Sequence, residues 1–299
     1  VEAFKDEVPK IGHGVLKLIE NERQTNKGFQ QAFEKFTAVC QEAINPNISV
    51  QAVEEMLIQH LLTERIFRTV FQNPDFVNLN LVAREIENVV HALVFPHGGR
   101  HEFFKPLDRF YKAIESAAAA LSDFSQKQAF LNTVYEKFFQ GFSVKVADTH
   151  GIVYTPQPIV TFMVNSIEEI LRTEFNSSLS NEGVHILDPF VGTGNFLIHV
   201  MQKLRKTALP HKYAHELHCN EVMLLPYYIA AMNIEHEYMT LTGDYQPFAG
   251  LCFVDTFELA EEKQLGLFTA ENTARVEQQK KAPIFVILGN PPYNAGQVN

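Results

Sequence analysis

The stretch "VHILDPFVGTGNF" at residues 184–196 joins an apolar run to an acid, two glycines and the start of a helical pattern. A short apolar run bounded by a turn is typical of a buried strand, and residues 195–206 have helical periodicity. Asp188 ends the strand at the carboxyl edge, where open α/β sheets bind their ligands. Gly192 and Gly194 remove side chains where the backbone must pass close to a ligand. The stretch therefore predicts an α/β fold with a nucleoside cofactor at this turn.

Strands and helices continue to alternate on both sides of this stretch. Helices are predicted at residues 158–175 and 224–235, and further strands at residues 215–222, 250–257 and 282–290. In the first of these helices the predicted apolar face consists of Ile159, Met163, Val164, Ile167, Ile170 and Leu171. The charged residues 258–281 predict a surface excursion with one or two helical turns. Such alternation is typical of βαβ units, so we predict a Rossmann-like parallel sheet.

The first half of the chain is predicted to be helical. Amphipathic patterns cover residues 27–44, 49–71, 79–95 and 126–142, and Ser49 is the predicted N-cap of the second. Because no strand-like alternation of useful length interrupts these patterns, we predict an all-helical domain at residues 1–148. The α/β domain is predicted to follow at residues 149–299.

Composition limits the partners and the cellular context. The chain has 299 residues and a net charge of −10, and its second half is the more acidic. A nucleic acid would therefore need a local basic surface or one on a further segment. No run approaches the roughly 18 apolar residues of a membrane span, and "VEAFKDEVPK" lacks an export signal. We expect a cytoplasmic protein with no membrane partner.

No metal site is predicted. His97 and His101 lie four residues apart, but two glycines separate them and no carboxylate or cysteine lies at ligand spacing. Cys40, Cys219 and Cys252 are far apart and form no CxxC pair. They are predicted to be buried free thiols rather than disulfides or zinc ligands.

Acids also end the next two predicted strands. Glu221 closes "HCNE", where a carboxylate can accept hydrogen bonds from both ribose hydroxyls of a nucleoside. Asp255 closes "CFVD", where it can accept from an adenine amino group. The glycine turn lacks the third glycine of the dinucleotide fingerprint, and no GxxxxGK[ST] is present. Both absences disfavour NAD and ATP.

These motifs resemble those of the adenine-N6 amino-methyltransferases, which use S-adenosylmethionine. "DPFVGTGNF" is similar to their cofactor motif and "NPPY" at residues 290–293 to their catalytic motif. "HGIVYTP" at residues 150–156 is similar to the additional cofactor motif that precedes the first strand in members of gamma order. The resemblance implies that S-adenosylmethionine contacts Tyr154, Thr155, Pro156, Asp188, Pro189, Phe190, Gly192, Gly194, Asn195, Phe196, Glu221 and Asp255.

Nearly the whole chain, most specifically residues 131–299, resembles the coupler and methyltransferase regions of type ISP restriction-modification enzymes. That resemblance implies double-stranded DNA as partner, and helicase-nuclease and target-recognition domains in the same polypeptide. In that family the sheet continues beyond the fourth strand, and the few residues after Tyr293 cannot supply the rest. We therefore expect the chain to be a fragment of a DNA methyltransferase, truncated after the fourth strand and inactive alone.

The catalytic motif suits methylation of an exocyclic amino group. Such a nitrogen is a poor nucleophile because its lone pair is delocalised into the ring. The Asn290 side-chain oxygen and the Pro291 carbonyl can accept its hydrogens and favour a pyramidal nitrogen. Pro291 and Pro292 hold these acceptors rigidly, and Tyr293 can stack on a base flipped out of a duplex. No metal or covalent intermediate is needed.

Two alternatives remain open. Protein-glutamine and RNA methyltransferases also place NPPY after a fourth strand, although they typically have a shorter N-terminal domain and lack a "YTP" segment of this kind. The chain could also be a non-catalytic module that couples a motor to a methyltransferase.

Overall fold

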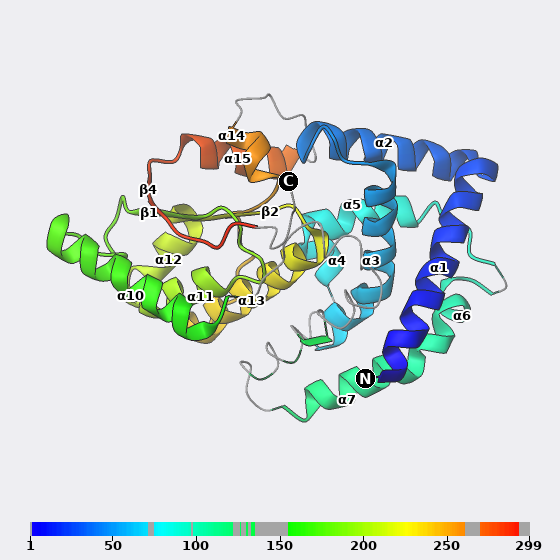
Figure 1. Cartoon of the computed structure of the whole chain (residues 1–299), viewed down its shortest axis with the longest axis horizontal. Coiled ribbons are helices and arrows are strands. Elements are labelled where there is room, and N and C mark those ends of the chain that lie inside the picture. Colours follow the sequence, from blue (N-terminus) through cyan, green and yellow to red (C-terminus); the bar gives the residue numbers. More distant parts are fainter. Residues whose placement is uncertain are drawn as a thin grey trace, which may run out of the picture. The chain divides into compact units, whose positions relative to one another are not determined.

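The computed structural model describes residues 2–70, 75–96, 98–121, 126, 130, 133–134, 155–260 and 270–292, with only the backbone for residues 2–8 and 260. The chain divides into two compact units (Figure 1). One comprises Val1–Gln41 and Pro46–His150, and the other comprises Glu42–Asn45 and Gly151–Asn299.

The first unit is helical in its described parts. Its elements are α1 (Glu2–Thr25), α2 (Lys27–Ala43), α3 (Val50–Val70), α4 (Phe76–Leu79), α5 (Leu81–Val90), α6 (Arg100–Phe104), η1 (Lys105–Leu107) and α7 (Asp108–Ala119). Helix α3 is central, because α1, α5 and α7 all pack on it. The Ser49 hydroxyl accepts a hydrogen bond from the Ala52 N–H at 3.1 Å, which confirms the predicted cap.

Of the helices predicted for this unit, one is shorter in the structure and another lies mostly outside the described residues. Helix α5 is shorter than the predicted 79–95, because Asn80 caps its start by accepting from the Val82 and Ala83 N–H groups. Most of the predicted helix at residues 126–142 lies outside the described residues.

A partly buried ionic cluster links three helices of the helical unit. Glu87 of α5 contacts His60 of α3 at 2.7 Å and pairs with Arg100 of α6. Burial alone would raise the pKa of Glu87, but the hydrogen bond with His60 and the charge of Arg100 lower it to about 2. Glu87 is therefore ionised at neutral pH, and its charge is compensated inside the unit.

The second unit is built on a four-stranded parallel sheet, which confirms the predicted fold class. Its strands are β1 (His185–Asp188), β2 (Leu217–Glu221), β3 (Leu251–Phe253) and β4 (Ile284–Ile287), in the order β3-β2-β1-β4. The register pairs Asp188 with Cys219 across β1 and β2, and Glu221 with Phe253 across β2 and β3. The chain therefore moves outward from β1 to β3 and then returns to the other side of β1.

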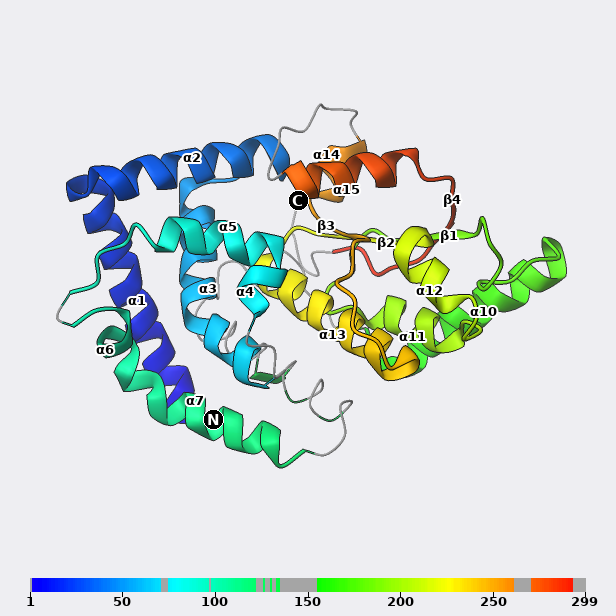
Figure 2. The same cartoon turned by 180° about the vertical axis from the view of Figure 1, so that it is seen from behind.

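Helices cover both faces of this sheet (Figures 1 and 2). The elements between the strands are α11 (Asn195–Lys203), α12 (Leu209–His211), η2 (Lys212–Glu216), α13 (Leu224–Thr242), α14 (Thr256–Ala260) and α15 (Ala270–Lys281), and α10 (Gln157–Glu174) precedes β1. In both views α10, α11 and α13 lie on one face, whereas α14 and α15 lie on the other. These two layers bury the sheet between them.

The apolar face predicted for α10 is partly wrong. Ile159 and Ile170 are about half exposed, whereas Val160, Val164 and Leu171 are buried. Both candidate stripes are apolar, so periodicity alone does not select the one that packs against α11.

The predicted excursion at residues 258–281 is more ordered than expected in its described part. Helix α15 packs beside β3, and its Asn272 side chain accepts from the Phe253 N–H at 3.0 Å and donates to the Phe253 carbonyl at 3.1 Å. Arg275 donates to the Leu251 carbonyl at 3.3 Å. The helix therefore packs through polar side chains that satisfy the outer edge of β3.

The three cysteines are buried and free, as predicted. Burial raises the pKa of the Cys252 thiol to about 12. The protonated thiols therefore act as small apolar groups in the interior.

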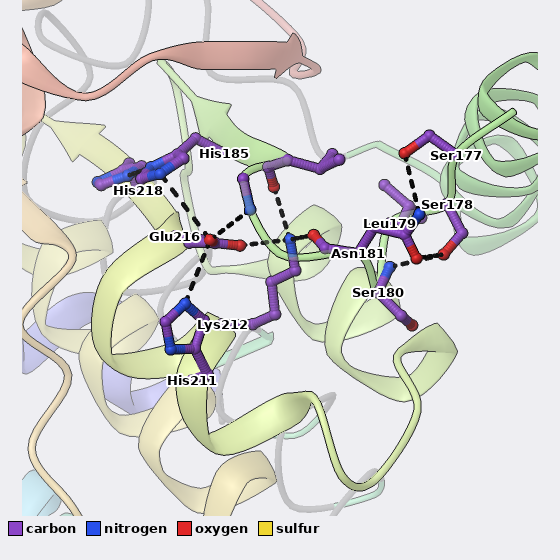
Figure 3. Close-up of polar contacts among 12 residues, drawn as sticks. Ser177, Ser178, Leu179, Ser180, Asn181, His185, His211, Lys212, Glu216 and His218 are labelled. Carbon is purple, nitrogen blue, oxygen red and sulfur yellow. Dashed lines mark hydrogen bonds and ion pairs between the residues drawn. The ribbon is translucent and has the colours of Figure 1, made fainter. Parts of the chain in front are cut away.

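A polar cluster closes the amino ends of β1 and β2 (Figure 3). The Lys212 ammonium group contacts a Glu216 carboxylate oxygen at 2.5 Å and donates to the Val184 carbonyl at 2.8 Å. Glu216 also accepts from the Gly183 N–H at 2.7 Å. His185 and His218 stack beside this pair, and burial lowers the pKa of His218 to about 4. The cluster satisfies its own groups at the end of the sheet opposite Asp188 and Glu221, so we interpret it as structural.

The polar contact between α15 and β3 can be tested by replacing Asn272 with an apolar residue of similar size. Asn272→Leu leaves the Phe253 N–H and C=O groups unsatisfied, so it should lower the free energy of unfolding by roughly 2 kcal/mol or more. Glu277→Ala, at an exposed position of the same helix, is the control and should stay within about 0.5 kcal/mol of wild type. Urea denaturation of the chain measures both, and equal stabilities would contradict this account of α15.

Candidate functional site

The carboxyl ends of β1 and β4 form the centre of the site. Asp188 ends β1 and Gly289 follows β4, and a Cβ atom added at Gly289 would lie 2.6 Å from Asp188 Oδ1. The order in which the strands are added reverses at β1, since β2 and β3 lie on one side of it and β4 on the other, and such a switch point leaves a crevice at the carboxyl ends of the strands. The sheet topology therefore brings the predicted cofactor motif and the predicted catalytic motif together.

Asp188 is fully buried and only partly satisfied. Its Oδ1 accepts from the Phe190 N–H at 3.1 Å, whereas its Oδ2 has no hydrogen-bond partner among the described residues. Burial raises the pKa of Asp188 to about 7, the Phe190 N–H opposes this rise, and the nearby Glu221 adds to it. A buried acceptor without a partner is costly, so this oxygen is suited to a donor or a cation from a ligand.

Glu221, at the end of β2, faces the glycine turn. Its Oε2 accepts from the Gly192 N–H at 3.0 Å, and its Oε1 accepts from the Val222 and Met223 N–H groups at 2.9 and 2.7 Å. Burial raises the pKa of Glu221 to about 7, although these three N–H groups lower it. The carboxylate therefore fixes the turn in place, and a carboxylate has further lone pairs to offer a ligand.

The glycine turn has the conformation that its sequence predicts. Gly192 and Gly194 have φ angles of 55° and 95°, which lie in the left-handed region. A Cβ atom at Gly194 would also lie 3.3 Å from the Ile234 side chain of α13. A Cβ atom at Gly192 would meet no atom within 4 Å, so the backbone there is open to a ligand, whereas Asn195 and Phe196 begin α11 as buried residues.

Asp255 follows β3, and a segment far away in the sequence holds its carboxylate. Its Oδ2 accepts from the Asn45 side chain at 2.8 Å, and its Oδ1 accepts from the Phe257 N–H at 3.0 Å. Asn45 belongs to the short segment of residues 42–45 that clusters with the α/β unit. The structure therefore adds Asn45 to the candidate site as a residue that orients Asp255.

The segment before α10 contacts both motifs. The Asn290 Nδ2 group donates to the Thr155 hydroxyl at 3.2 Å, and the Gln157 side chain donates to Asn195 Oδ1 at the same distance. Pro156 is the N-cap of α10. The predicted residues Tyr154 and Tyr293 lie outside the described residues.

A pocket of about 520 Å³ opens beside these residues. Its lining comes from the cofactor motif, the residues after β4 and one side of α10: Phe162, Met163, Ser166, Ile167, Pro189, Phe190, Ile287, Leu288, Gly289 and Pro291. Pro291 and Pro292 are exposed. The lining is mostly apolar, which suits a flat organic group, and the acids and Asn290 are not part of it.

Three further residues support the site and were missed by sequence reasoning. The Thr256 hydroxyl donates to the Pro189 carbonyl at 2.6 Å and accepts from the Asn220 side chain at 3.1 Å. Asn233 donates to the Thr193 carbonyl at 2.9 Å. Asn233 could have been noticed, because it is a single amide in the apolar run "LLPYYIAAMNIE".

Among the described residues, no group of three or more histidine, cysteine or acidic side chains is arranged to hold a metal ion. No helix in the same part of the chain combines the length and apolar character that crossing a bilayer requires.

Two family profiles together match almost the whole chain. Residues 1–126 match the profile described as type ISP restriction-modification enzyme, coupler domain. Residues 126–298 match the profile described as N-6 DNA methylase. No curated protein sequence gives a significant match.

Three solved structures are similar over nearly the full length of the chain. The DrdV–DNA complex, solved by cryo-electron microscopy, is 37% identical over 100% of the chain, with a TM-score of 0.90. The type ISP enzyme LlaBIII bound to DNA is 35% identical over 100%, with a TM-score of 0.89. A nuclease-deletion mutant of the type ISP enzyme LlaGI, in complex with a DNA substrate mimic, is 34% identical over 99%, with a TM-score of 0.87. The chain spans only 29%, 21% and 24% of these three proteins, respectively.

The burial of Asp188 predicts a specific pH dependence of stability. Its folded pKa of about 7 lies above its ordinary value of 3.8, so the stability it contributes at low pH is lost as the pH rises through 7. An asparagine side chain does not ionise, so Asp188→Asn does not lose stability in this way as the pH rises. The variant should therefore gain stability relative to wild type between pH 5 and pH 7, by up to about 1.4 kcal/mol per pH unit, and should gain no more above the folded pKa. Urea denaturation at both pH values measures the difference, and parallel pH profiles would show that Asp188 is not buried as described.

Proposed function

We propose a function from one premise, which is that the chain belongs to the N-6 DNA methylase family. Methylases of this family depend on S-adenosylmethionine. The three solved relatives are longer, and two of them are described as type ISP restriction-modification enzymes. The chain would therefore supply the coupler and methyltransferase regions of such an enzyme. Its reaction would be methyl transfer to the N6 amino group of an adenine in duplex DNA.

One observation carries this proposal. Asn290 and Asp188, from motifs about a hundred residues apart, lie at neighbouring strand ends on either side of the switch point. The hydrogen bond from Asn290 to Thr155 adds the segment before α10 to the same place. The three motifs that resemble methyltransferase motifs therefore converge on one edge of the sheet, as a shared reaction centre requires.

The residues at this edge fit S-adenosylmethionine. The unsatisfied Asp188 Oδ2 suits the positively charged amino acid part of the cofactor, and the open backbone at Gly192 allows close approach. Glu221 would accept the ribose hydroxyls and Asp255 the adenine amino group. When bound, the cofactor supplies a methyl group that is activated by a positively charged sulfonium.

The catalytic motif would act on the base. The Asn290 side-chain oxygen and the Pro291 carbonyl would accept the hydrogens of the adenine amino group, which localises the nitrogen lone pair. Pro291 and Pro292 restrict the backbone and donate no N–H group there, so the acceptors face no competing donor. Tyr293 would stack on the flipped base, a role that rests on the sequence alone.

DNA recognition would need more than this chain. The second half of the chain is acidic, and the chain spans less than a third of each solved relative. The helicase-nuclease and target-recognition parts are therefore proposed to lie elsewhere in the full-length protein. We propose that residues 1–299 alone do not methylate DNA.

The ribose assignment of Glu221 can be tested with a cofactor analogue that lacks both ribose hydroxyls. Wild-type full-length protein should bind S-adenosylmethionine roughly ten- to a hundredfold more tightly than the analogue, because charge-assisted hydrogen bonds are lost with the hydroxyls. In Glu221→Ala the two ligands should bind almost equally. Calorimetry measures all four affinities, and the comparison within each protein cancels a general loss of stability. An unchanged preference for the ribose in the variant would remove Glu221 from this role.

Asn290→Ala in the full-length protein tests the catalytic assignment. Loss of one transition-state acceptor commonly lowers a rate by about 10² to 10³, so methyl transfer should fall by that factor. Cofactor affinity should stay within about threefold of wild type. Asn165→Ala, at an exposed position of α10, is the control.

The assay follows tritium from labelled cofactor into duplex DNA, RNA and protein, and nucleoside analysis then identifies the methylated base. Adenine methylated at N6 supports the proposal. Label in RNA or protein, or a variant with wild-type activity, would overturn it.

A further inference from the structure

Catalysis by Asn290 has an orientation requirement. The two ends of its side-chain amide are nearly equal in size, but only the oxygen can accept a hydrogen from a substrate amino group. If the amide is reversed, the Asn290 Nδ2 group, which is a donor, faces the amino group of the substrate, which is also a donor. A neighbour that accepts from Nδ2 therefore favours the reactive orientation, in which Oδ1 is at the other end of the planar amide group and faces away from that neighbour.

Thr155 is such a neighbour. Its hydroxyl oxygen accepts from Asn290 Nδ2 at 3.2 Å, across 135 positions of sequence. A hydroxyl group keeps lone pairs for this bond even when its proton is donated elsewhere. We infer, on the basis of the function proposed above, that Thr155 is a positioning residue that holds the Asn290 amide with its oxygen toward the methyl-accepting amino group.

Thr155 can position another group because its own backbone is held in place. The next residue, Pro156, accepts hydrogen bonds from the Ile159 and Val160 N–H groups of α10 at 2.9 and 3.2 Å. Val160 is completely buried and anchors this first turn. Gln157 links the same turn to Asn195 at the start of α11. The hydroxyl therefore has a fixed place relative to both the cofactor motif and β4.

The contribution of Thr155 should appear in the chemical step. When the amino group develops positive charge, the bond to Asn290 Oδ1 strengthens, and polarisation of the amide makes Nδ2 a better donor to Thr155. The Thr155 bond is then worth more in the transition state than in the ground state, so its loss lowers kcat even when the enzyme is saturated with cofactor.

A double-mutant cycle in the full-length protein tests this inference. Thr155→Val keeps the shape and removes the acceptor, so kcat at saturating cofactor should fall roughly three- to tenfold, whether or not cofactor affinity also changes. Thr155→Ser restores the hydroxyl and should recover most of the rate. In the Asn290→Ala background, Thr155→Val should cause no further loss in single-turnover methyl transfer. This absence of a second effect is the expected result if Thr155 acts through Asn290.

Two results would overturn the inference and leave the proposed function in place. One is an equal loss of rate from Thr155→Val in both backgrounds, which would mean that Thr155 acts independently of Asn290. The other is a loss confined to cofactor affinity, measured by calorimetry, which would make Thr155 a cofactor contact only. Wild-type activity in Asn290→Ala, in contrast, would reject the proposed function itself.

Discussion

The return of β4 to the free side of β1 is the constraint on which the site depends. Parallel strands need crossovers, and the reversal of strand order at β1 sends the α11 and α13 connections to one face and the α15 connection to the other. The loops after β1 and β4 therefore diverge and leave room between them. At their starts, however, the two loops are so close together that Gly289 has no space for a side chain beside Asp188. Any larger residue there would push the catalytic motif away from the cofactor motif.

Much of this arrangement could be predicted because it depends on short, local sequence patterns. β1, β3 and β4 lie in short stretches rich in apolar residues, and Asp188, Glu221, Asp255 and "GNPPY" stand at or just after the ends of β1 to β4 in order. Carboxyl ends of parallel strands meet at one edge, so those polar residues had to converge. The glycines of the turn adopt left-handed φ angles, which is the backbone requirement that their presence indicates.

The remaining features depend on tertiary contacts that leave no local pattern. The bond between Asn45 and Asp255 joins residues 210 positions apart, and nothing in the sequence around Asn45 indicates it. Helix α15 has few apolar residues, so an apolar stripe could not identify its packing through Asn272 and Arg275. In α10 two apolar stripes compete, and only the position of α11 decides that Val160 is buried and Ile159 is not.

The side-chain contacts of α15 also determine at which edge the sheet can pair with a further strand. Asn272 and Arg275 occupy the outer groups of β3 with bonds that another strand would otherwise make. On the opposite side of the sheet, β4 pairs with β1, no described strand lies along its outer edge, and Phe285 and Ile287 are half or more exposed. A backbone can therefore be added by strand pairing at β4 but not at β3. In evolutionary terms, insertions and fused modules that extend this sheet can be accommodated on one side only, and the β3 side is protected from edge-to-edge self-association.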